Sequence, residues 1–191
     1  MHSAMSHAPT LRDRLDTTSA TVAVIGQGYV GLPLALAFAR TGFRTIGIEI
    51  DPERVARLND GSSYIGDVAD GEIREVVRSG DYRATDDYAA VADADAVSIC
   101  VPTPLRKTRD PDTSYIQSAA ESLAPHLVGP TLVVLESTTY PGTTEEILVP
   151  LLEEEADDHT LGEDLFVAFS PERVDPGNEE YDIENTPKVV G

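Results

Sequence analysis

The segment TVAVIGQGYVGLPLALAFAR, residues 21–40, constrains the fold more than any other part of this chain. Its first five residues are mostly β-branched, as in a buried parallel strand, and its last part, Leu32–Ala39, is rich in helix formers. Three glycines with the spacing of a dinucleotide-binding turn lie between these parts: Gly26, Gly28 and Gly31. The first allows a tight turn, the second lets a pyrophosphate approach the backbone, and the third lets the helix pack close to the strand. The helix N-terminus adds free N–H groups, so the segment predicts a phosphate-binding strand–turn–helix unit.

An acidic residue lies at the distance that such a unit requires. A second strand is predicted over residues 44–50, and within it Glu49 lies 21 residues after Gly28. A carboxylate there accepts hydrogen bonds from an adenosine ribose and repels a 2′-phosphate, so the pattern favours NAD over NADP. Arg54 leaves three alternatives open: a contact to the ribose, a contact to a 2′-phosphate, or a surface position on a helix. The competing interpretation of the whole segment is a structural glycine turn beside a solvated glutamate.

The charge balance excludes two classes of partner. The 191 residues include 34 acidic and 14 basic side chains, for a net charge of −20. Nucleic acids and anionic membranes bind basic surfaces, so we expect neither as a partner. Two explanations of the acidity remain open: a solvated surface that favours solubility, or adaptation to high internal salt, where self-repulsion is screened.

Several further features indicate a cytoplasmic protein. No apolar run approaches the roughly 20 residues that cross a bilayer, and the polar start MHSAMSHAPT lacks a signal-peptide pattern. The single cysteine, Cys100, permits no internal disulfide. His2 and His7 are expected to be tail residues rather than metal ligands, and no metal site is predicted.

Strands alternate with helices along nearly the whole chain. Further strands are predicted over residues 81–84, 96–101, 131–135, 165–169 and 188–190, and further helices over residues 52–58, 71–79, 86–91, 113–123 and 143–155. The alternation predicts the α/β class, as a Rossmann-like, doubly wound parallel sheet with helices on both faces. Residues 20–191 are expected to form this NAD-binding domain. Residues 1–19 are expected to be a flexible tail with at most one helical turn around residues 11–15.

Hydroxyl-bearing residues follow two of the predicted strands. Thr103 lies between two prolines that end one strand, and Thr138 follows the strand at 131–135. The carboxyl ends of parallel strands form the edge where such sheets bind ligands, so we expect Thr103 to contact a cofactor. Thr143 and Thr144 are placed to cap the next helix.

Five motifs occur together and in order after residue 20. They are GQGYVGLPLA at the glycine turn, CVPTPL (Cys100–Leu105), ESTTYPGTTEE (Glu136–Glu146), SPERVDPGN (Ser170–Asn178) and NTPKVVG (Asn185–Gly191). In this combination the chain resembles the amino-terminal half of the nucleotide-sugar 6-dehydrogenases, a family that includes UDP-glucose and UDP-N-acetylhexosamine dehydrogenases. The third and fourth motifs most resemble the UDP-N-acetylglucosamine 6-dehydrogenase branch, followed by the UDP-N-acetylmannosamine enzymes.

The resemblance implies a four-electron oxidation, in which the C6 alcohol of the sugar becomes a carboxylate, two NAD are reduced and one water is consumed. In that family a cysteine from a later domain forms a thiohemiacetal and then a thioester, which water hydrolyses. The resemblance implies cofactor contacts for Gly26, Gly28, Tyr29, Val30, Gly31, Glu49, Arg54, Thr103 and Thr138, and catalytic roles for Thr138 and Glu172.

The implied roles differ along the chain. Glu49 would hold the adenosine ribose, Arg54 the adenosine end of the cofactor, and Thr103 the other ribose. Thr138 would lie near the nicotinamide and position a water, and Glu172 would act near the sugar on water or the aldehyde. A positioned carboxylate accelerates such a proton transfer by about 10²–10⁴-fold. Without the resemblance, Thr138 is more simply a helix cap and Glu172 a turn residue.

The sequence departs from the UDP-glucose branch of that family. The branch has an aromatic residue and a glutamate where this chain has Arg173 and Pro176, and Asp175 lies one position short of the second site. The difference favours an N-acetylated sugar. Two roles remain open for Arg173, a contact to the nucleotide-sugar or an ion pair with Asp175.

Cys100 lies in a predicted buried strand and is expected to be a structural residue rather than a nucleophile. The family's catalytic cysteine and its sugar-binding and uridine-binding domains would lie beyond Gly191. The resemblance therefore implies a UDP-sugar partner bound mostly by other domains and a homodimeric parent enzyme. The chain itself is expected to be a monomer that binds NAD weakly without turnover. Two alternatives are a free-standing module that senses NAD, and another two-domain NAD enzyme such as a 3-hydroxyacid dehydrogenase.

Overall fold

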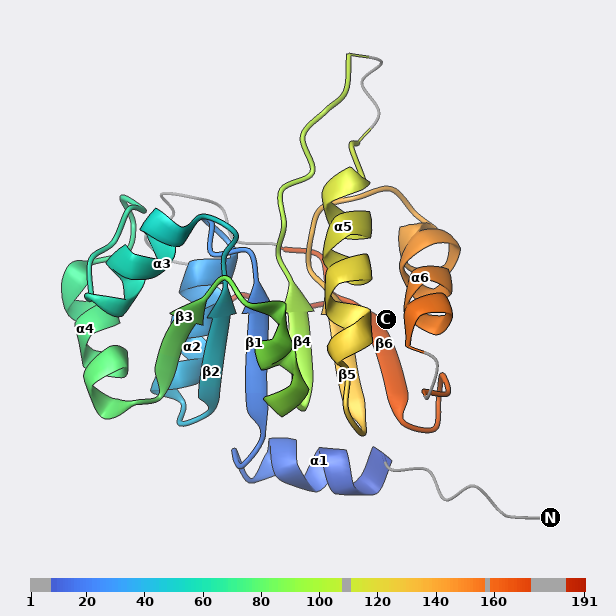
Figure 1. Cartoon of the computed structure of the whole chain (residues 1–191), viewed down its shortest axis with the longest axis horizontal. Helices are drawn as coiled ribbons and strands as arrows, with labels where there is room; N and C mark the ends of the chain where they lie inside the picture. Colours follow the sequence, from blue (N-terminus) through green and yellow to red (C-terminus); the bar gives the residue numbers. More distant parts are fainter. Residues whose placement is uncertain (1–7, 108–110, 157–158, 173–184) are drawn as a thin grey trace.

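The computed structural model describes residues 8–107, 111–156, 159–172 and 185–191 (Figure 1). Six parallel strands form one sheet in the order β3-β2-β1-β4-β5-β6. The strands are β1 (Thr21–Ile25), β2 (Arg44–Ile48), β3 (Tyr82–Thr85), β4 (Ala96–Ile99), β5 (Thr131–Leu135) and β6 (Leu165–Phe169). This order confirms the predicted Rossmann-like, doubly wound sheet. From the central β1–β4 pair, β2 and β3 are added toward one edge of the sheet, whereas β5 and β6 are added toward the other.

The helices form layers on both faces of the sheet. They are α1 (Ala8–Asp16), α2 (Gly31–Arg40), α3 (Pro52–Asn59), α4 (Asp70–Ser79), the 3₁₀-helices η1 (Tyr88–Asp93) and η2 (Ala124–His126), α5 (Ser114–Leu123), the π-helical turn η3 (Thr144–Leu148) and α6 (Val149–Glu155). Figure 1 shows α5 in front of the sheet and α2 behind it. Within the described residues, no helix has both the length and the apolar character that spanning a bilayer requires.

Two hydrophobic cores explain why both faces are covered. In β1, Ala23 and Ile25 pack with η1, α5 and α6, whereas Val22 and Val24 pack with α2, α3 and α4. Successive side chains of a strand point to opposite faces, so one short run of apolar residues supplies both cores. All five residues of β1 are buried, as expected of a strand that pairs on both sides, with β2 and with β4.

The amino-terminal helix is longer than the single turn that the sequence predicts. Helix α1 crosses beneath the amino ends of the strands (Figure 1). Leu11 is buried, and Arg14 forms an ion pair with Asp95, the residue before β4. Asp95 also accepts a hydrogen bond from the backbone N–H of Thr21, at 2.8 Å. These tertiary contacts supply stability that a nine-residue helix lacks by itself in water.

Two local predictions are wrong. Residues 188–190 form no strand, and only Gly191 pairs with β6, through two backbone hydrogen bonds to Phe169 of 2.8 and 3.0 Å. Thr143 does not cap the next helix with its side chain, because its own backbone is already helical, with φ −55° and ψ −38°. Its hydroxyl instead donates to the carbonyl of Tyr140, at 2.9 Å, and contacts the hydroxyl of Thr139.

Candidate functional site

The sequence-predicted site residues lie at one edge of the sheet. This edge is formed by the carboxyl ends of the parallel strands, at the top of Figure 1. Gly26 to Val30 follow β1, Glu49 follows β2, Thr103 lies beyond β4, Thr138 beyond β5 and Glu172 beyond β6. Residues from five segments of the chain thus share the edge where parallel α/β sheets bind ligands.

The glycine turn is crowded on its inner side. Gly26 has a positive φ of 88°, and its N–H donates to Ile48 O at 2.8 Å. A Cβ atom added to Gly26 would lie 2.8 Å from Cys100 O, and one added to Gly31 would lie 1.9 Å from Gly26 O. The first and third glycines are therefore needed for the turn to close and for α2 to start directly against it.

The same turn is open on its outer side. A Cβ atom added to Gly28 would meet no protein atom within 4 Å. Tyr29 is 69% exposed, and Val30 is the residue from which α2 begins. The combination of a crowded inner side and an open outer side fits a pyrophosphate that lies against the backbone at the N-terminus of α2.

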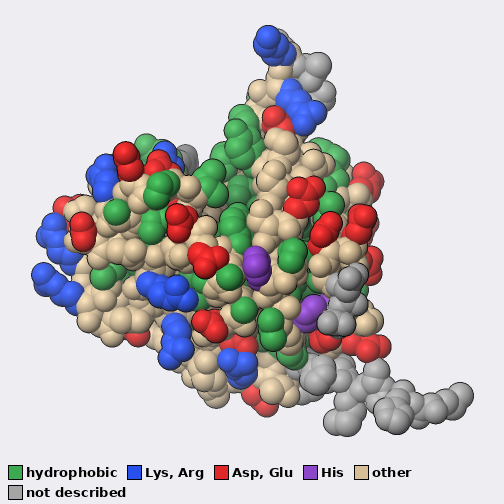
Figure 2. All heavy atoms as spheres, in the orientation of Figure 1, with side chains coloured by type: hydrophobic (Ala, Val, Ile, Leu, Met, Phe, Trp, Pro, Cys, Tyr) green, Lys and Arg blue, Asp and Glu red, His purple; other side chains and the backbone are tan. Residues whose placement is uncertain are grey.

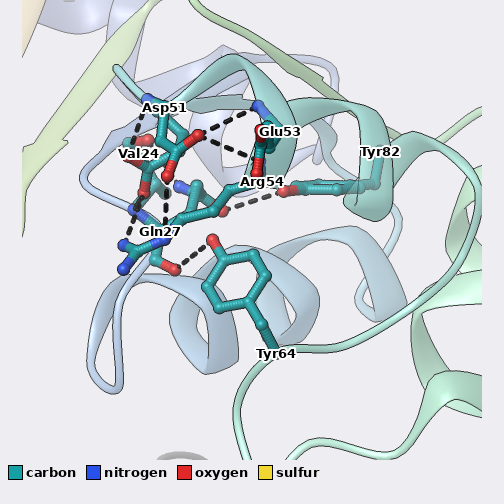
Figure 3. A network of polar contacts seen from close by, with 8 residues as sticks. Val24, Gln27, Asp51, Glu53, Arg54, Tyr64 and Tyr82 are labelled. Atoms are coloured by element: carbon teal, nitrogen blue, oxygen red, sulfur yellow. Dashed lines mark hydrogen bonds and ion pairs between the residues drawn. The ribbon is translucent and has the colours of Figure 1, made fainter.

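Gln27, between the first two glycines, holds the turn in place (Figure 3). Gln27 is fully buried, and each of its four polar groups has a hydrogen-bond partner. The side-chain amide donates to Val24 O at 2.7 Å and accepts from the Tyr82 hydroxyl at 2.8 Å. The backbone N–H donates to Glu49 Oε2 at 3.3 Å, and the carbonyl accepts from the Tyr64 hydroxyl at 2.6 Å. The sequence carries no signal for this role, because the fingerprint allows any residue between the two glycines.

Glu49 presents an oriented carboxylate beside the turn. It is buried, with an exposure of 6%. Its Oε1 accepts from the N–H of Asp51 at 3.2 Å, and its Oε2 accepts from the N–H of Gln27. Arg54 Nη1 lies 3.7 Å from Oε2. Two backbone donors and one guanidinium therefore fix the side chain without a ligand.

Asp51 caps α3 as predicted and joins the same cluster. Its Oδ1 accepts from the N–H groups of Glu53 and Arg54, at 2.9 and 3.4 Å. Pro52 is the first residue of α3, where a missing N–H leaves no hydrogen bond unmade. This cap brings Arg54 back over the end of β2, within reach of Glu49.

Thr103 and Thr138 are brought together. The Thr103 hydroxyl donates to the carbonyl oxygen of Thr138, so the segments that follow β4 and β5 are tied to one another. Ser137 anchors the second segment from below by donating to Val101 O at 2.7 Å. Thr138 is exposed to solvent.

Glu172 belongs to a group of three charged residues. Lys188 Nζ lies 2.8 Å from Glu136 Oε2 and 3.4 Å from Glu172 Oε2. Burial raises the pKa of Glu136, against the lowering effect of its hydrogen bond to Lys188. Burial by itself would lower the pKa of Lys188, but the two carboxylates raise it overall, so the lysine stays charged. The sequence predicted only Glu172. The predictions for Arg173 and Asp175 fall outside the described residues.

Cys100 is buried, as the sequence predicts. Its pKa is raised to about 12, first of all by burial, so the thiol is protonated at neutral pH. Its Cβ would lie 3.1 Å from a Cβ atom added to Gly31. Cys100 therefore packs beneath the glycine turn and offers no nucleophile to the site.

A separate hollow of about 610 Å³ lies beside the edge strand β6. Its lining includes Leu161, Phe166 and Phe169. Three strands lie between β6 and β2 in the sheet, so the hollow is not part of the site around Glu49. The described residues include no group of three or more His, Cys, Asp or Glu side chains arranged to hold a metal ion.

Charge is unevenly distributed over the visible face. Figure 2 shows basic and acidic side chains mixed over the side that carries α3 and α4, whereas acidic side chains predominate over α5 and α6. Helix α3 contributes Arg54 and Arg57 together with Glu53 to the mixed side, and α6 contributes Glu153, Glu154 and Glu155 to the acidic side. An anionic cofactor at the glycine turn therefore meets the less negative half of a molecule whose net charge is −20.

Comparison with known proteins identifies the family. Residues 20–191 match the NAD-binding domain of the UDP-glucose/GDP-mannose dehydrogenase family. This chain belongs to that family. The NAD-binding domain is 38% identical over 177 residues to the UDP-N-acetyl-D-mannosamine dehydrogenase of Salmonella typhi, covering 90% of this chain and 41% of that protein. It is 33% identical over 169 residues to the UDP-N-acetyl-D-glucosamine 6-dehydrogenase of Salmonella typhi, covering 88% and 39%.

A solved structure supports the same relationship. The NDP-N-acetyl-D-galactosaminuronic acid dehydrogenase from Methanosarcina mazei Go1 aligns with a TM-score of 0.84 and 31% identity, covering 95% of this chain and 41% of that one. The cofactor of this domain is therefore NAD. The chain spans about two fifths of the length of the curated relatives cited above. These relatives include a UDP-N-acetylmannosamine and a UDP-N-acetylglucosamine dehydrogenase. The sequence identity is higher to the first, at 38%, than to the second, at 33%, so it does not favour the N-acetylglucosamine branch that the motifs suggested.

Proposed function

We propose that this NAD-binding domain serves a longer nucleotide-sugar 6-dehydrogenase, which oxidises the C6 alcohol of a UDP-N-acetylhexosamine to a carboxylate with two NAD. The observation that carries the proposal is the junction of the glycine turn with an oriented carboxylate, where Gln27 N–H lies 3.3 Å from Glu49 Oε2. The junction brings the two halves of a dinucleotide site together in a chain that also has the family's later motifs.

The turn and the carboxylate divide the binding of NAD between them. The open backbone at Gly28, Tyr29 and Val30 receives the pyrophosphate, with the N-terminus of α2 behind it. Glu49 accepts hydrogen bonds from the adenosine ribose, and its own backbone partners hold it ready to do so. NAD, when bound, supplies the oxidising power of the reaction by accepting a hydride.

Residues beyond β4, β5 and β6 serve the reacting end. Thr103 holds the Thr138 segment and faces the second ribose, and the exposed Thr138 positions a water. A hydroxyl suits that task because it both donates and accepts. Glu172, held by Lys188 at 3.4 Å, acts on water or on the aldehyde.

The sugar is proposed from the motifs and from the relatives. Arg173 and Pro176 stand where the UDP-glucose branch has an aromatic residue and a glutamate, and the relatives cited above are N-acetylhexosamine enzymes. We propose UDP-N-acetylglucosamine or UDP-N-acetylmannosamine as the substrate of the longer enzyme, bound mostly by its other domains. UDP-glucose is the third candidate.

The chain by itself is proposed to bind NAD without turnover. Its one cysteine is buried beneath the glycine turn, with a raised pKa, so it cannot provide the thiolate on which the family chemistry depends. The same observation supports the second candidate function, a module that binds NAD without catalysis. Whether the protein also carries sugar-binding and uridine-binding domains separates the two candidates.

Titration of the 191-residue chain with NADH and NADPH by calorimetry, at low and at molar salt, tests the cofactor half of the proposal. Saturable binding of NADH with much weaker NADPH is expected, and loss of NADH binding in a Glu49→Gln variant should accompany it. Absence of binding in a folded wild-type chain, at both salt concentrations, would contradict the site at the glycine turn.

Turnover assays test the other half. The chain is incubated with NAD and each of UDP-N-acetylglucosamine, UDP-N-acetylmannosamine and UDP-glucose, and NADH is followed by absorbance. No turnover is expected from the chain itself, and oxidation of an N-acetylated sugar is expected from the longer protein. A longer protein that oxidises only UDP-glucose would contradict the proposed substrate class.

A further inference from the structure

Arg54 is already engaged by protein groups on three sides. Its Nη1 lies 3.7 Å from Glu49 Oε2, and its Nε lies 3.5 Å from Asp51 Oδ2. Its guanidinium carbon also lies 5.0 Å from the centre of the Tyr64 ring, within the range of a cation–π contact. The residue that could have served a 2′-phosphate is thus directed toward two carboxylates and an aromatic face.

Tyr64 connects this arginine to the glycine turn. Tyr64 lies in the segment between α3 and α4, and its hydroxyl donates to Gln27 O at 2.6 Å. Arg57 also lies over its ring, at 5.7 Å. Burial, followed by the charge of Glu49, raises the pKa of the Tyr64 phenol, so the hydroxyl remains a donor across the physiological range.

The partner of Tyr64 is itself rigid. Gln27 is fully buried and is held from inside by Val24 and by the Tyr82 hydroxyl, at 2.7 and 2.8 Å. Figure 3 shows the hydroxyl groups of Tyr64 and Tyr82 both directed toward Gln27, with Arg54 and Asp51 in the same cluster. The Tyr64 ring is therefore anchored at its hydroxyl end, and it presents a fixed face to Arg54.

We infer that Tyr64 is a specificity-determining residue of the cofactor site, because its ring holds Arg54 in its ion pairs with Glu49 and Asp51, so that the guanidinium is not free to receive a 2′-phosphate. A free 2′-hydroxyl meets the Glu49 carboxylate, which accepts its hydrogen bond. A 2′-phosphate brings two negative charges to the same place, where the Arg54 guanidinium is already paired with Glu49 and Asp51. The inference rests on the proposed cofactor site, and it does not depend on the sugar.

The test compares two substitutions of Tyr64 in the 191-residue chain. Tyr64→Leu removes the ring and the hydroxyl, whereas Tyr64→Phe removes the hydroxyl alone. Dissociation constants for NADH and NADPH are measured by calorimetry, and folding is checked by thermal unfolding. Tyr115→Leu is the matched control, because Tyr115 is a half-exposed tyrosine of α5 on the other side of the sheet.

The two substitutions are expected to differ in selectivity. Tyr64→Leu releases Arg54, so the preference for NADH over NADPH should fall by roughly fivefold, mainly through tighter NADPH binding. Tyr64→Phe keeps the ring under Arg54, so both cofactors should weaken together by roughly twofold to tenfold while their ratio stays unchanged. A merely structural role would weaken both cofactors equally in both variants, and this result would overturn the inference.

Arg54→Gln decides the question if Tyr64→Leu does not fold. In our inference the wild-type arginine contacts no 2′-phosphate, so its loss should not weaken NADPH relative to NADH. A selective loss of NADPH binding would show that Arg54 already serves the phosphate, and would overturn the inference. Absence of NADH binding by the folded wild-type chain would instead overturn the cofactor site itself, and the role of Tyr64 with it.

Discussion

Lys188 Nζ lies 2.8 Å from Glu136 Oε2, although 52 residues separate the two in the sequence. Glu136 directly follows β5 and is buried, and Lys188 lies near the end of the chain. The contact ties the last described segment to the edge of the sheet that carries Thr138. It also places the lysine next to Glu172, which has a proposed role in catalysis.

Replacing Lys188 by methionine should destabilise the protein, because the substitution leaves Glu136 buried without its cation. We expect a loss of about 2 kcal/mol in the free energy of unfolding, less than for a fully buried pair because the Lys188 side chain keeps 25% exposure. Urea unfolding measures this loss. The control is Lys107→Met, an exposed lysine beyond β4. Equal stability of both variants and the wild type would show that the ion pair contributes nothing.

The raised pKa of Glu136 predicts a pH dependence of stability. Between its ordinary value of 4.5 and its raised value, this carboxyl binds more protons in the folded state than in the unfolded state. Its contribution is therefore fully present below pH 4.5 and is lost as the pH rises through the raised pKa. We expect the stability of the wild type, relative to Glu136→Gln, to fall over that window in urea titrations at several pH values. Glu153→Gln, on the exposed side of α6, should show no such trend, and a flat difference for Glu136→Gln would contradict the assignment.

Substitutions at two glycines of the turn should affect different properties, the stability of the fold in one case and cofactor binding in the other. Gly31→Ala should cost about 3 kcal/mol of stability, because its Cβ would lie 1.9 Å from Gly26 O and the backbone there cannot move aside. Gly28→Ala should change stability by less than about 1 kcal/mol, because its Cβ meets no protein atom, yet it should weaken NADH binding at least about tenfold. Calorimetry and thermal unfolding of both variants test this. Wild-type affinity in Gly28→Ala would show that the pyrophosphate does not approach the backbone there.

The helix beneath the sheet predicts that the amino-terminal segment contributes to stability. Leu11→Ala should lower the free energy of unfolding by about 2 kcal/mol, since Leu11 is 6% exposed against the rest of the fold. Arg12→Ala on the same helix is the control, because the Arg12 side chain is 83% exposed. Urea unfolding distinguishes the two. If both variants match the wild type, residues 8–16 behave as the flexible tail that the sequence suggested.

Local patterns were sufficient for most of the fold. The runs at residues 131–135 and 165–169 form β5 and β6 with the predicted bounds, and the Asp51-Pro52 pair caps α3 as expected. These features rest on short-range chemistry, namely side-chain periodicity and the backbone preferences of a few residues. The predicted site residues lie at one edge of the sheet for a related reason, because each follows a strand and the strands are parallel.

The sequence by itself determined the α/β class, the glycine turn and the acidic residue that follows the second strand, since each of these depends on neighbours in the chain. Only the tertiary structure decided that Tyr64 lies under Arg54, that Lys188 reaches Glu136, and that α1 packs beneath the sheet. These contacts join segments far apart in sequence or depend on how separate elements meet. The local periodicity of the sequence does not predict these contacts. Their stabilising energy comes from burial and charge pairing, which exist only after the sheet has assembled.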